Sequence, residues 1–272
     1  MKADGHVQLF LGEHELEQVD RFLPNGEVCV RTLRSPGKPG SNEDAAAVIQ
    51  LGDSSLVLAV ADGVGGMPAA RDASNAAVQT LARVLRKLPD DTPELRPAIL
   101  DAVDKANHNV LGLARGAATT LVIAQLDLKR LRCYHVGDSE LLAVGQRGRI
   151  KQRVVPHSPT GFAVEAGLLD EDEAVQHDQR HVLFNVIGSP DMRVEVGPTL
   201  QLAVHDTVLL ATDGLFDNLF IDEIVDSICS GPLVAAANRL VERARARMRG
   251  EARADLPCKP DDLTVVLFRP RR

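Results

Sequence analysis

Aromatic residues are scarce in this sequence, which has no tryptophan, one tyrosine and seven phenylalanines among 272 residues. A hydrophobic core must therefore be built from leucine, valine, isoleucine and alanine, side chains that suit β-sheets backed by closely packed helices. Apolar residues make up 44% of the chain. This length and composition allow a substantial core, in one large domain or two small ones.

Basic residues are not in excess either, since the formal net charge is -7. Sequence-independent binding to nucleic acid or to an anionic membrane is therefore not expected. The acidic excess instead suggests carboxylates gathered around cations. The four cysteines show no CxxC spacing and do not cluster with histidine, which argues against a zinc knuckle or a redox pair and predicts free thiols.

Long apolar runs are also missing. The first residues lack the uninterrupted apolar stretch of a signal peptide, and no run approaches the length that crosses a bilayer. We therefore expect a cytoplasmic protein without a membrane or nucleic-acid partner.

The apolar pattern predicts an α+β fold. Expected strands cover residues 6–11, 28–33, 45–50, 56–60, 119–126, 131–136, 141–144, 149–154, 181–187, 193–196, 199–203, 208–212 and 263–268. Expected helices cover residues 69–88, a segment that opens with Thr92 as N-cap and Pro93 at its first position, 222–229 and 233–249, the last with an Arg-rich face in solvent. This order fits an antiparallel sandwich with helices outside each sheet, in a single domain over residues 1–272. The polar residues 156–180 are expected to form a flap over one end of the sheets.

Acidic residues recur where predicted strands meet loops. The apolar run before Asp62 (LVLAVADGVGG) ends at an Asp-Gly pair, and the run before Asp213 (DTVLLATDG) ends in the same way. One such pair is usually a plain β-turn. Further acidic residues lie at other predicted strand ends: Glu43, Asp44, Asp138, Asp261 and Asp262. Because carboxylates are poor strand residues, this repetition predicts a shared site.

Carboxylates that converge in one site would repel each other and raise one another's pKa unless cations neutralise them. Carboxylate, carbonyl and water oxygens favour Mg²⁺ or Mn²⁺ over zinc. Two such ions can lower the pKa of a bridging water and direct it at a phosphorus centre. The pattern therefore suggests hydrolysis of a phosphate ester.

Six motifs in order resemble the bacterial members of the metal-dependent PPM protein phosphatases, type 2C: NEDA at 42–45, VADGVGG at 60–66, GAATTLV at 116–122, HVGDS at 135–139, ATDGLFDNL at 211–219 and DDLTVVL at 261–267. The resemblance covers the chain from about Thr32 to Phe268. It implies a four-layer α-β-β-α sandwich of two antiparallel sheets flanked by pairs of antiparallel helices. It also implies hydrolysis of phosphoserine or phosphothreonine by direct attack of a metal-bridging water or hydroxide.

The resemblance assigns roles to the carboxylates. Asp62 would bridge two Mn²⁺ or Mg²⁺ ions, the Gly63 carbonyl would bind the first, and Asp213 and Asp261 would bind the second. Asp44 would orient metal-bound waters. Asp138 matches a ligand of a third, weaker ion in bacterial members. Asp62, Asp44 and Asp213 are thus the predicted catalytic residues.

The sequence departs from the family pattern at several positions. Val64 stands where many eukaryotic members have a histidine that can act as general acid, so the leaving alkoxide is expected to take its proton from a metal-bound water. Pro39 stands where bacterial members often have a phosphate-binding arginine. Lys38 and Arg34 are the predicted replacements, and a solvated loop lysine is the alternative for Lys38. Glu140 replaces the arginine that commonly follows the GDS motif.

Two other functions remain open on sequence grounds. One is a catalytically silent, phosphatase-like regulatory module that binds a phosphorylated partner, although every expected metal position is filled. The other is a metal-dependent hydrolase of small phosphate esters. For the leading hypothesis we expect a phosphorylated protein substrate, a cognate Ser/Thr protein kinase and a monomeric enzyme.

Overall fold

The computed structural model describes residues 7–66, 69–89, 92, 94–113, 116–253 and 256–271, and its strands form two antiparallel sheets. The first sheet has the order β1 (Val7–Phe10), β4 (Asp44–Leu51), β5 (Ser55–Asp62), β6 (Leu121–Asp127), β7 (Arg130–Val136) and β10 (Glu195–Val196), with β11 (Leu200–Gln201) also on β7. The second has the order β2 (Leu16–Phe22), β3 (Gly26–Leu33), β13 (Leu263–Pro270), β12 (Thr207–Ala211), β8 (Glu140–Val144) and β9 (Ile150–Arg153).

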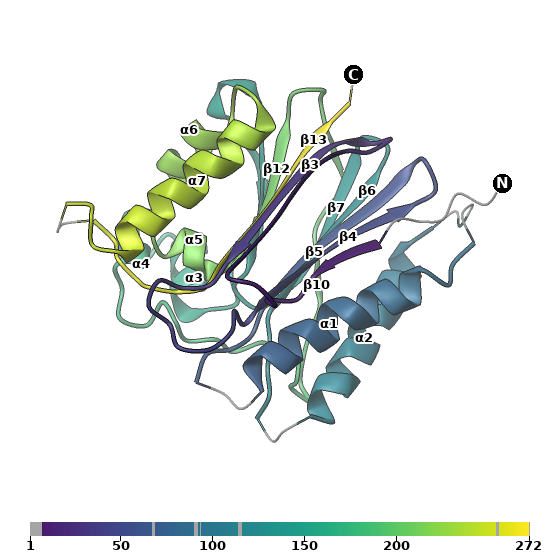
Figure 1. The fold of residues 1–272 in the computed structure, drawn as a ribbon, viewed down its shortest axis with the longest axis horizontal. Helices are drawn as coiled ribbons and strands as arrows, with labels where there is room; N and C mark the ends of the chain where they lie inside the picture. The colour runs from purple at the N-terminus through teal and green to yellow at the C-terminus, as the bar shows by residue number, and fades with distance from the viewer. Residues whose placement is uncertain are drawn as a thin grey trace.

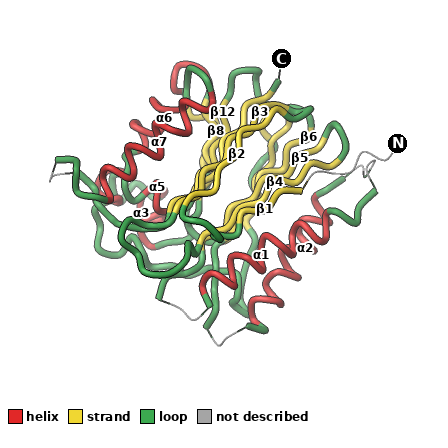
Figure 2. Tube along the Cα trace, viewed as in Figure 1, coloured by secondary structure: helices red, strands yellow, loops and turns green. Residues whose placement is uncertain are grey.

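Helices cover the outer face of each sheet (Figure 1). The first sheet is covered by α1 (Ala70–Leu85) and α2 (Arg96–Leu111), and the second by α6 (Ile221–Ile228) and α7 (Leu233–Met248). Figure 2 shows the strands of both sheets between these two helix pairs. The predicted α+β sandwich of four layers is thus confirmed.

The long apolar strands are explained by burial on both faces. In β4, Ala45, Ala47 and Ile49 pack with the residues of α1 and α2, whereas Ala46 and Val48 belong to the cluster between the two sheets. Such strands read as continuous apolar runs because neither face meets water. Small alanines here allow close approach of the neighbouring layers.

Three expectations about elements were wrong. Residues 181–187 are turns and irregular backbone instead of a strand, with only an isolated bridge between Ile187 and Thr119, because Val182 and Phe184 have no core to face and lie exposed. Strand β2 was missed because it is a charged edge strand whose side chains mostly face solvent. The second helix begins at Arg96, so Thr92 is not its N-cap; the Thr92 hydroxyl donates to the Pro89 carbonyl instead. Pro93, the predicted first position, lies outside the described residues.

Short helices surround one end of the sheets. The segment predicted as a flap contains α3 (Pro159–Glu165) and α4 (Glu171–Val175), and lies between β9 and β10. The Ser158 hydroxyl caps α3 by accepting from the Gly161 amide at 3.0 Å. Helix α5 (Asp213–Phe216) directly follows β12, and the 3-10 turn η1 (Gln146–Gly148) joins β8 to β9.

Two simpler expectations can be compared directly with the structure. The four cysteines, all within the described residues, are free thiols as predicted. Every helix in the described parts of the chain is too short or too polar to cross a lipid bilayer.

The arginine-rich face of α7 is solvated only in part, since Arg243 is exposed whereas Arg247 is buried. Arg247 is 6% exposed and donates to the Asn218 carbonyl at 3.0 Å and to both carboxylate oxygens of Glu223 at 2.7 and 3.0 Å. Arg243 donates to the Ser227 hydroxyl at 3.2 Å. These side chains reach around α7 to fasten it to α6 and to the loop after α5.

We predict that Arg247→Met lowers the free energy of unfolding by about 1 to 3 kcal/mol, because the buried Asn218 carbonyl and the partly buried Glu223 carboxylate lose their partner. Urea denaturation followed by circular dichroism measures this change. The matched variant Arg83→Met, at an exposed position of α1, should change the same free energy by less than about 0.5 kcal/mol. Equal effects of the two substitutions would contradict the structural role of Arg247.

Candidate metal and catalytic site

Adjacent strands place the first two carboxylates. In the antiparallel pair of β4 and β5, Asp44 lies opposite Asp62. Thr120 fixes the backbone of Asp62 on its other side, since its hydroxyl accepts from the Asp62 amide at 3.0 Å and its amide donates to the Asp62 carbonyl at 2.8 Å. The Thr119 hydroxyl also donates to that carbonyl, at 2.7 Å. The threonine pair of the GAATT motif thus holds Asp62 rigidly at the strand end.

Glycines at both Asp-Gly turns permit close backbone contacts. A Cβ at Gly63 would collide with the carbonyl of Ala70 at the start of α1, and a Cβ at Gly214 would collide with the Asp262 carbonyl. These approaches bring α1 against the first turn and the loop before β13 against the second. Asp213 is the first residue of α5, and the close approach of Gly214 to Asp262 places it on the same cavity wall as Asp261 and Asp262.

A third turn places Asp138. Gly137 has a φ of +100°, which favours glycine, and it exchanges two hydrogen bonds with His157. Its amide donates to His157 Nδ1 at 3.0 Å, and the His157 amide donates to its carbonyl at 2.9 Å. The Ser139 and Thr120 hydroxyls are 2.6 Å apart. The turn that carries Asp138 is therefore connected, through Ser139, to the same threonine that fixes Asp62.

These strand ends open into one cavity of about 250 Å³. Its walls carry most of the predicted site, together with residues that the sequence did not single out: Glu43, Asp62, Gly63, Val64, Gly65, Thr120, Asp138, His181, Leu183, Asp213, Lys259, Asp261 and Asp262. Asp44 lies behind this wall and is fully buried. The structure thus brings together carboxylates from segments up to about 200 residues apart in the sequence.

The electrostatics of the cavity are unfavourable for so many carboxylates. Burial, followed by repulsion from Asp44 and Asp213, raises the pKa of Asp62 well above its usual range. Burial and neighbouring carboxylates likewise raise the pKa of Asp44 and of Asp138, and they raise the pKa of Asp261 to about 6. The cluster needs compensating positive charge to remain ionised at neutral pH.

Two oxygens in this cluster are buried without a hydrogen-bond partner in the described structure, Asp44 Oδ1 and Asp213 Oδ1. The other oxygen of Asp44 accepts from the Thr212 hydroxyl at 2.9 Å, which fixes the carboxylate plane. Buried polar atoms are seldom left unpaired. Orphaned oxygens in an all-oxygen donor set fit a hard divalent cation such as Mg²⁺ or Mn²⁺.

Lys259 and Asp217 also belong to the site, although they were not predicted from the sequence. The Lys259 ammonium forms ion pairs with Asp213, with Asp217 at 2.8 Å and with Asp261 at 3.1 Å. Burial alone would lower the pKa of Lys259, but these three carboxylates raise it above its usual range, so the side chain is charged. A lysine two residues before Asp261 was the available signal, because it places a cation beside a predicted ligand. His181, at the end of the segment after α4, was missed as a wall residue because its stretch was predicted as a strand.

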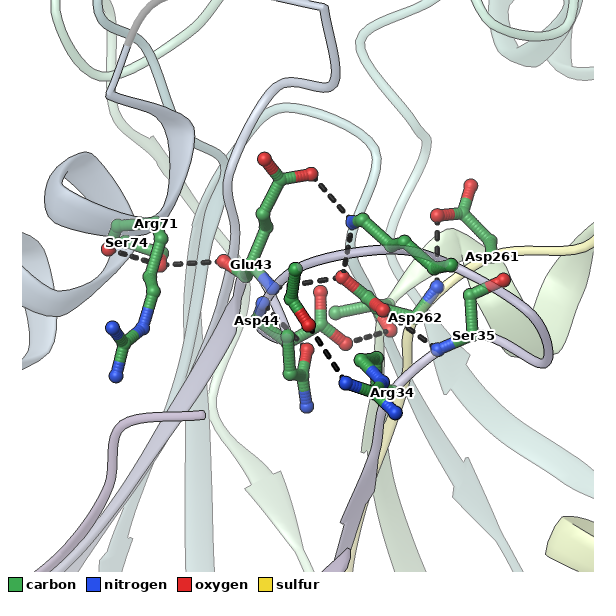
Figure 3. Close-up of polar contacts among 12 residues, drawn as sticks. Arg34, Ser35, Glu43, Asp44, Arg71, Ser74, Asp261 and Asp262 are labelled. Atoms are coloured by element: carbon green, nitrogen blue, oxygen red, sulfur yellow. Dashed lines mark hydrogen bonds and ion pairs between the residues drawn. The ribbon is translucent and has the colours of Figure 1, made fainter. Parts of the chain in front are cut away.

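The predicted phosphate-binding residues Lys38 and Arg34 have partners within the protein. Figure 3 shows Arg34 together with Glu43 and Asp262, the two residues that pair with Lys38. Lys38 Nζ lies 2.6 Å from Glu43 Oε2 and 2.6 Å from Asp262 Oδ2, which argues against a freely solvated lysine. Asp262 also accepts from the Ser35 and Glu43 amides, each at 2.7 Å. Arg34 donates to the Gly40 carbonyl at 2.8 Å and so braces its own loop. Phosphate binding by either residue stays a prediction.

A second cavity, of about 290 Å³, adjoins the first between the 156–180 segment and the second sheet, and Asp138 and Asp213 line both cavities. Glu140 lies on its wall, buried, and binds Arg153 at 2.7 Å. Arg153 also reaches Glu171 of α4 at 3.0 Å. Glu140, which stands where an arginine is usual, is therefore ion-paired with Arg153 on the neighbouring strand.

Among the described residues, the side chains whose ligand atoms all lie within 4.8 Å of one another are those of His135, His157 and Glu195, a group separate from the aspartate cavity. The two imidazoles are stacked, with centroids 4.4 Å apart and planes at 24°, so their in-plane lone pairs run side by side and do not converge on one ion. His135 Nε2 lies 3.0 Å from the Val155 carbonyl. These histidines serve to hold the turn at Gly137.

Comparison with known proteins gives the same assignment along most of the chain. The family model for protein phosphatase 2C matches residues 37–256. The serine/threonine protein phosphatase PstP of Mycobacterium tuberculosis is 30% identical over 223 residues, which cover 78% of this chain and 40% of PstP. This chain thus spans less than half the length of that relative.

Solved structures show the same fold. The PPM Ser-Thr phosphatase MsPP of Mycobacterium smegmatis, in complex with cacodylate, has a TM-score of 0.73 at 28% identity, covering 89% of this chain and 97% of MsPP. The catalytic domain of PstP in complex with two manganese ions has a TM-score of 0.71 at 22% identity, covering 94% of this chain and 100% of that domain. With its six motifs meeting around one carboxylate cavity and the family model matching most of its length, this chain belongs to the protein phosphatase 2C family, as a bacterial-type PPM member.

Proposed function

We propose that this protein is a metal-dependent phosphatase that removes phosphate from phosphoserine or phosphothreonine in proteins, by direct attack of water and without a covalent phospho-enzyme. The observation that carries the proposal is the meeting of Asp62, Asp138, Asp213 and Asp261 in one cavity that is open to solvent. Burial raises the pKa of three of these carboxylates, and Lys259 pairs with the fourth, Asp213. Such a cluster contributes nothing to packing. It suits the binding of cations that in turn bind a phosphate group.

The residues fit two core ions. Asp62 and the Gly63 carbonyl would hold one, Asp62 with Asp213 and Asp261 would hold the other, and Asp138 would contribute to a third and weaker site. When bound, Mn²⁺ or Mg²⁺ would supply an activated water and neutralise the phosphate charge. Asp44, opposite Asp62 on the neighbouring strand, keeps a buried oxygen without a hydrogen-bond partner and would orient water there. The solved PstP catalytic domain with two manganese ions supports this assignment of the metal.

The leaving group needs a proton. The side chain of Val64 has no acidic proton to give, and its backbone amide already donates to the Ala118 carbonyl at 3.0 Å. Water in the cavity would supply the proton, and His181 is the imidazole on the same wall. This arrangement needs no histidine after the first Asp-Gly turn.

The names of the relatives support a protein substrate. PstP and MsPP are both Ser/Thr phosphatases, so a phosphorylated protein and a cognate Ser/Thr kinase are the partners that we propose. A monomer located in the cytoplasm remains our prediction. A silent regulatory module is less well supported, because each predicted ligand position carries an oxygen donor and Asp44 and Asp213 keep unpaired oxygens.

We predict that the full chain releases phosphate from a phosphothreonine peptide in the presence of Mn²⁺ and that EDTA abolishes this release. Asp62→Asn and Asp213→Asn should each lower kcat by about a hundredfold or more, because each removes a charge that holds the cations. Phosphate release is followed colorimetrically. Peptide binding without any turnover by the unmutated protein would support the regulatory module instead, and turnover of p-nitrophenyl phosphate alone would support a small-ester hydrolase.

We also predict that Asp62→Asn stabilises the chelator-treated protein at pH 8 by about 1 to 2 kcal/mol, since it removes a negative charge that is disfavoured first by burial and then by the neighbouring carboxylates. Thermal unfolding with EDTA measures this gain. The exposed control Asp53→Asn should leave the stability within about 0.5 kcal/mol of the unmutated protein. A loss of stability in Asp62→Asn would mean that the carboxylate has a structural partner instead of a repulsive environment.

A further inference from the structure

Lys259 is the cation closest to the predicted metal ligands. It lies in the loop between α7 and β13, and its side chain is 22% exposed. Its ammonium lies among the carboxylates of Asp213, Asp217 and Asp261. Two of these three carboxylates are the proposed ligands of the second ion.

The backbone holds Lys259 in this place. The Lys259 amide donates to Asn218 Oδ1 at 2.9 Å, and Asn218 Nδ2 donates to the Lys259 carbonyl at 2.8 Å and to the Gly214 carbonyl at 3.0 Å. Asn218 itself is fully buried. The side chain of Lys259 therefore starts from a fixed point beside Asp213, unlike that of a lysine in a mobile surface loop.

The ammonium and a divalent cation would share the same two carboxylates, since Lys259 pairs with Oδ2 of Asp213 and of Asp261 while Asp213 Oδ1 has no partner. An ion such as Mg²⁺ binds oxygen at about 2.1 Å, closer than the 2.8 to 3.1 Å of the two longer lysine contacts. Asp213 and Asp261 cannot surround both at once at these distances. Two cations on the same carboxylates repel each other, so binding of the second ion would weaken the ion pairs of Lys259 with Asp213 and Asp261, while Asp217 remains to hold the lysine.

We propose that Lys259 is a built-in counter-ion that neutralises the second metal position in the metal-free protein and competes with the divalent cation for Asp213 and Asp261. The proposal rests on the proposed metal-dependent function and adds a property of this chain. It has two consequences. The first is a second ion that binds more weakly than the carboxylate set alone would allow. The second is a metal-free protein that is protected from carboxylate repulsion.

Calorimetric titration of Mn²⁺ into the chelator-treated full chain tests the competition. Lys259→Met keeps most of the side-chain length but removes the charge, and it should tighten the weaker class of Mn²⁺ sites by about tenfold or more. Lys259→Arg, which keeps the charge, should retain weak binding. The matched control is Lys151→Met. Lys151 lies on β9, is 26% exposed and pairs with Asp206 at 2.5 Å, so its replacement should leave Mn²⁺ binding unchanged.

Thermal unfolding provides a second readout that does not depend on activity. With EDTA, Lys259→Met should unfold at a lower temperature than the unmutated protein, and saturating Mn²⁺ should remove this difference. If the variant does not fold without metal, Lys259→Gln takes its place, since its amide can still donate to the same carboxylates.

Equal Mn²⁺ affinity in the unmutated protein and in the neutral Lys259 variants would overturn the proposal while leaving the metal-dependent function intact. Equal tightening in Lys259→Arg would also overturn it, because the charge would then not be the cause. Absence of Mn²⁺ binding in the unmutated chain would instead contradict the proposed function itself.

Discussion

Mutual repulsion among carboxylates that are partly removed from water is the constraint on which this structure depends. Burial and neighbouring charge raise the pKa of Asp62, Asp44 and Asp138, while the surrounding backbone prevents these residues from moving apart. The fold therefore contains a region that is costly without positive charge. Both the proposed metals and the ion pairs of Lys259 reduce this cost, and they do so at the same carboxylates.

The sandwich explains how this arrangement is held. Strands buried on both faces provide a rigid base, and the carboxylates lie near the ends of those strands. Asp62 is held there by its own amide and carbonyl, which both bond to Thr120. Thr120 connects the turn of Asp62 to that of Asp138, and Asn218 connects α5 to the loop of Lys259. Rigid placement of this kind is what binding and positioning of a phosphate group require.

Much of this could be predicted from the sequence because the signals were local. The apolar runs before Asp62 and Asp213 fixed strand ends, and the motif order indicated that these ends meet. Other features depended on contacts between distant segments. The ion pairs of Lys38 with Glu43 and Asp262, and of Lys259 with Asp213, join residues up to 224 positions apart. Strand β2 and the irregular stretch at 181–187 were misjudged because edge position and exposure are decided by tertiary neighbours, not by alternation.

The most direct test of this account is a crystal structure of the full chain grown with Mn²⁺, with anomalous scattering recorded for manganese. The account predicts two strong anomalous peaks that share Asp62, one beside the Gly63 carbonyl and one between Asp213 and Asp261, with the Lys259 ammonium displaced toward Asp217. A map in which Asp62, Asp213 and Asp261 surround no manganese, and in which Lys259 keeps all three ion pairs, would contradict it.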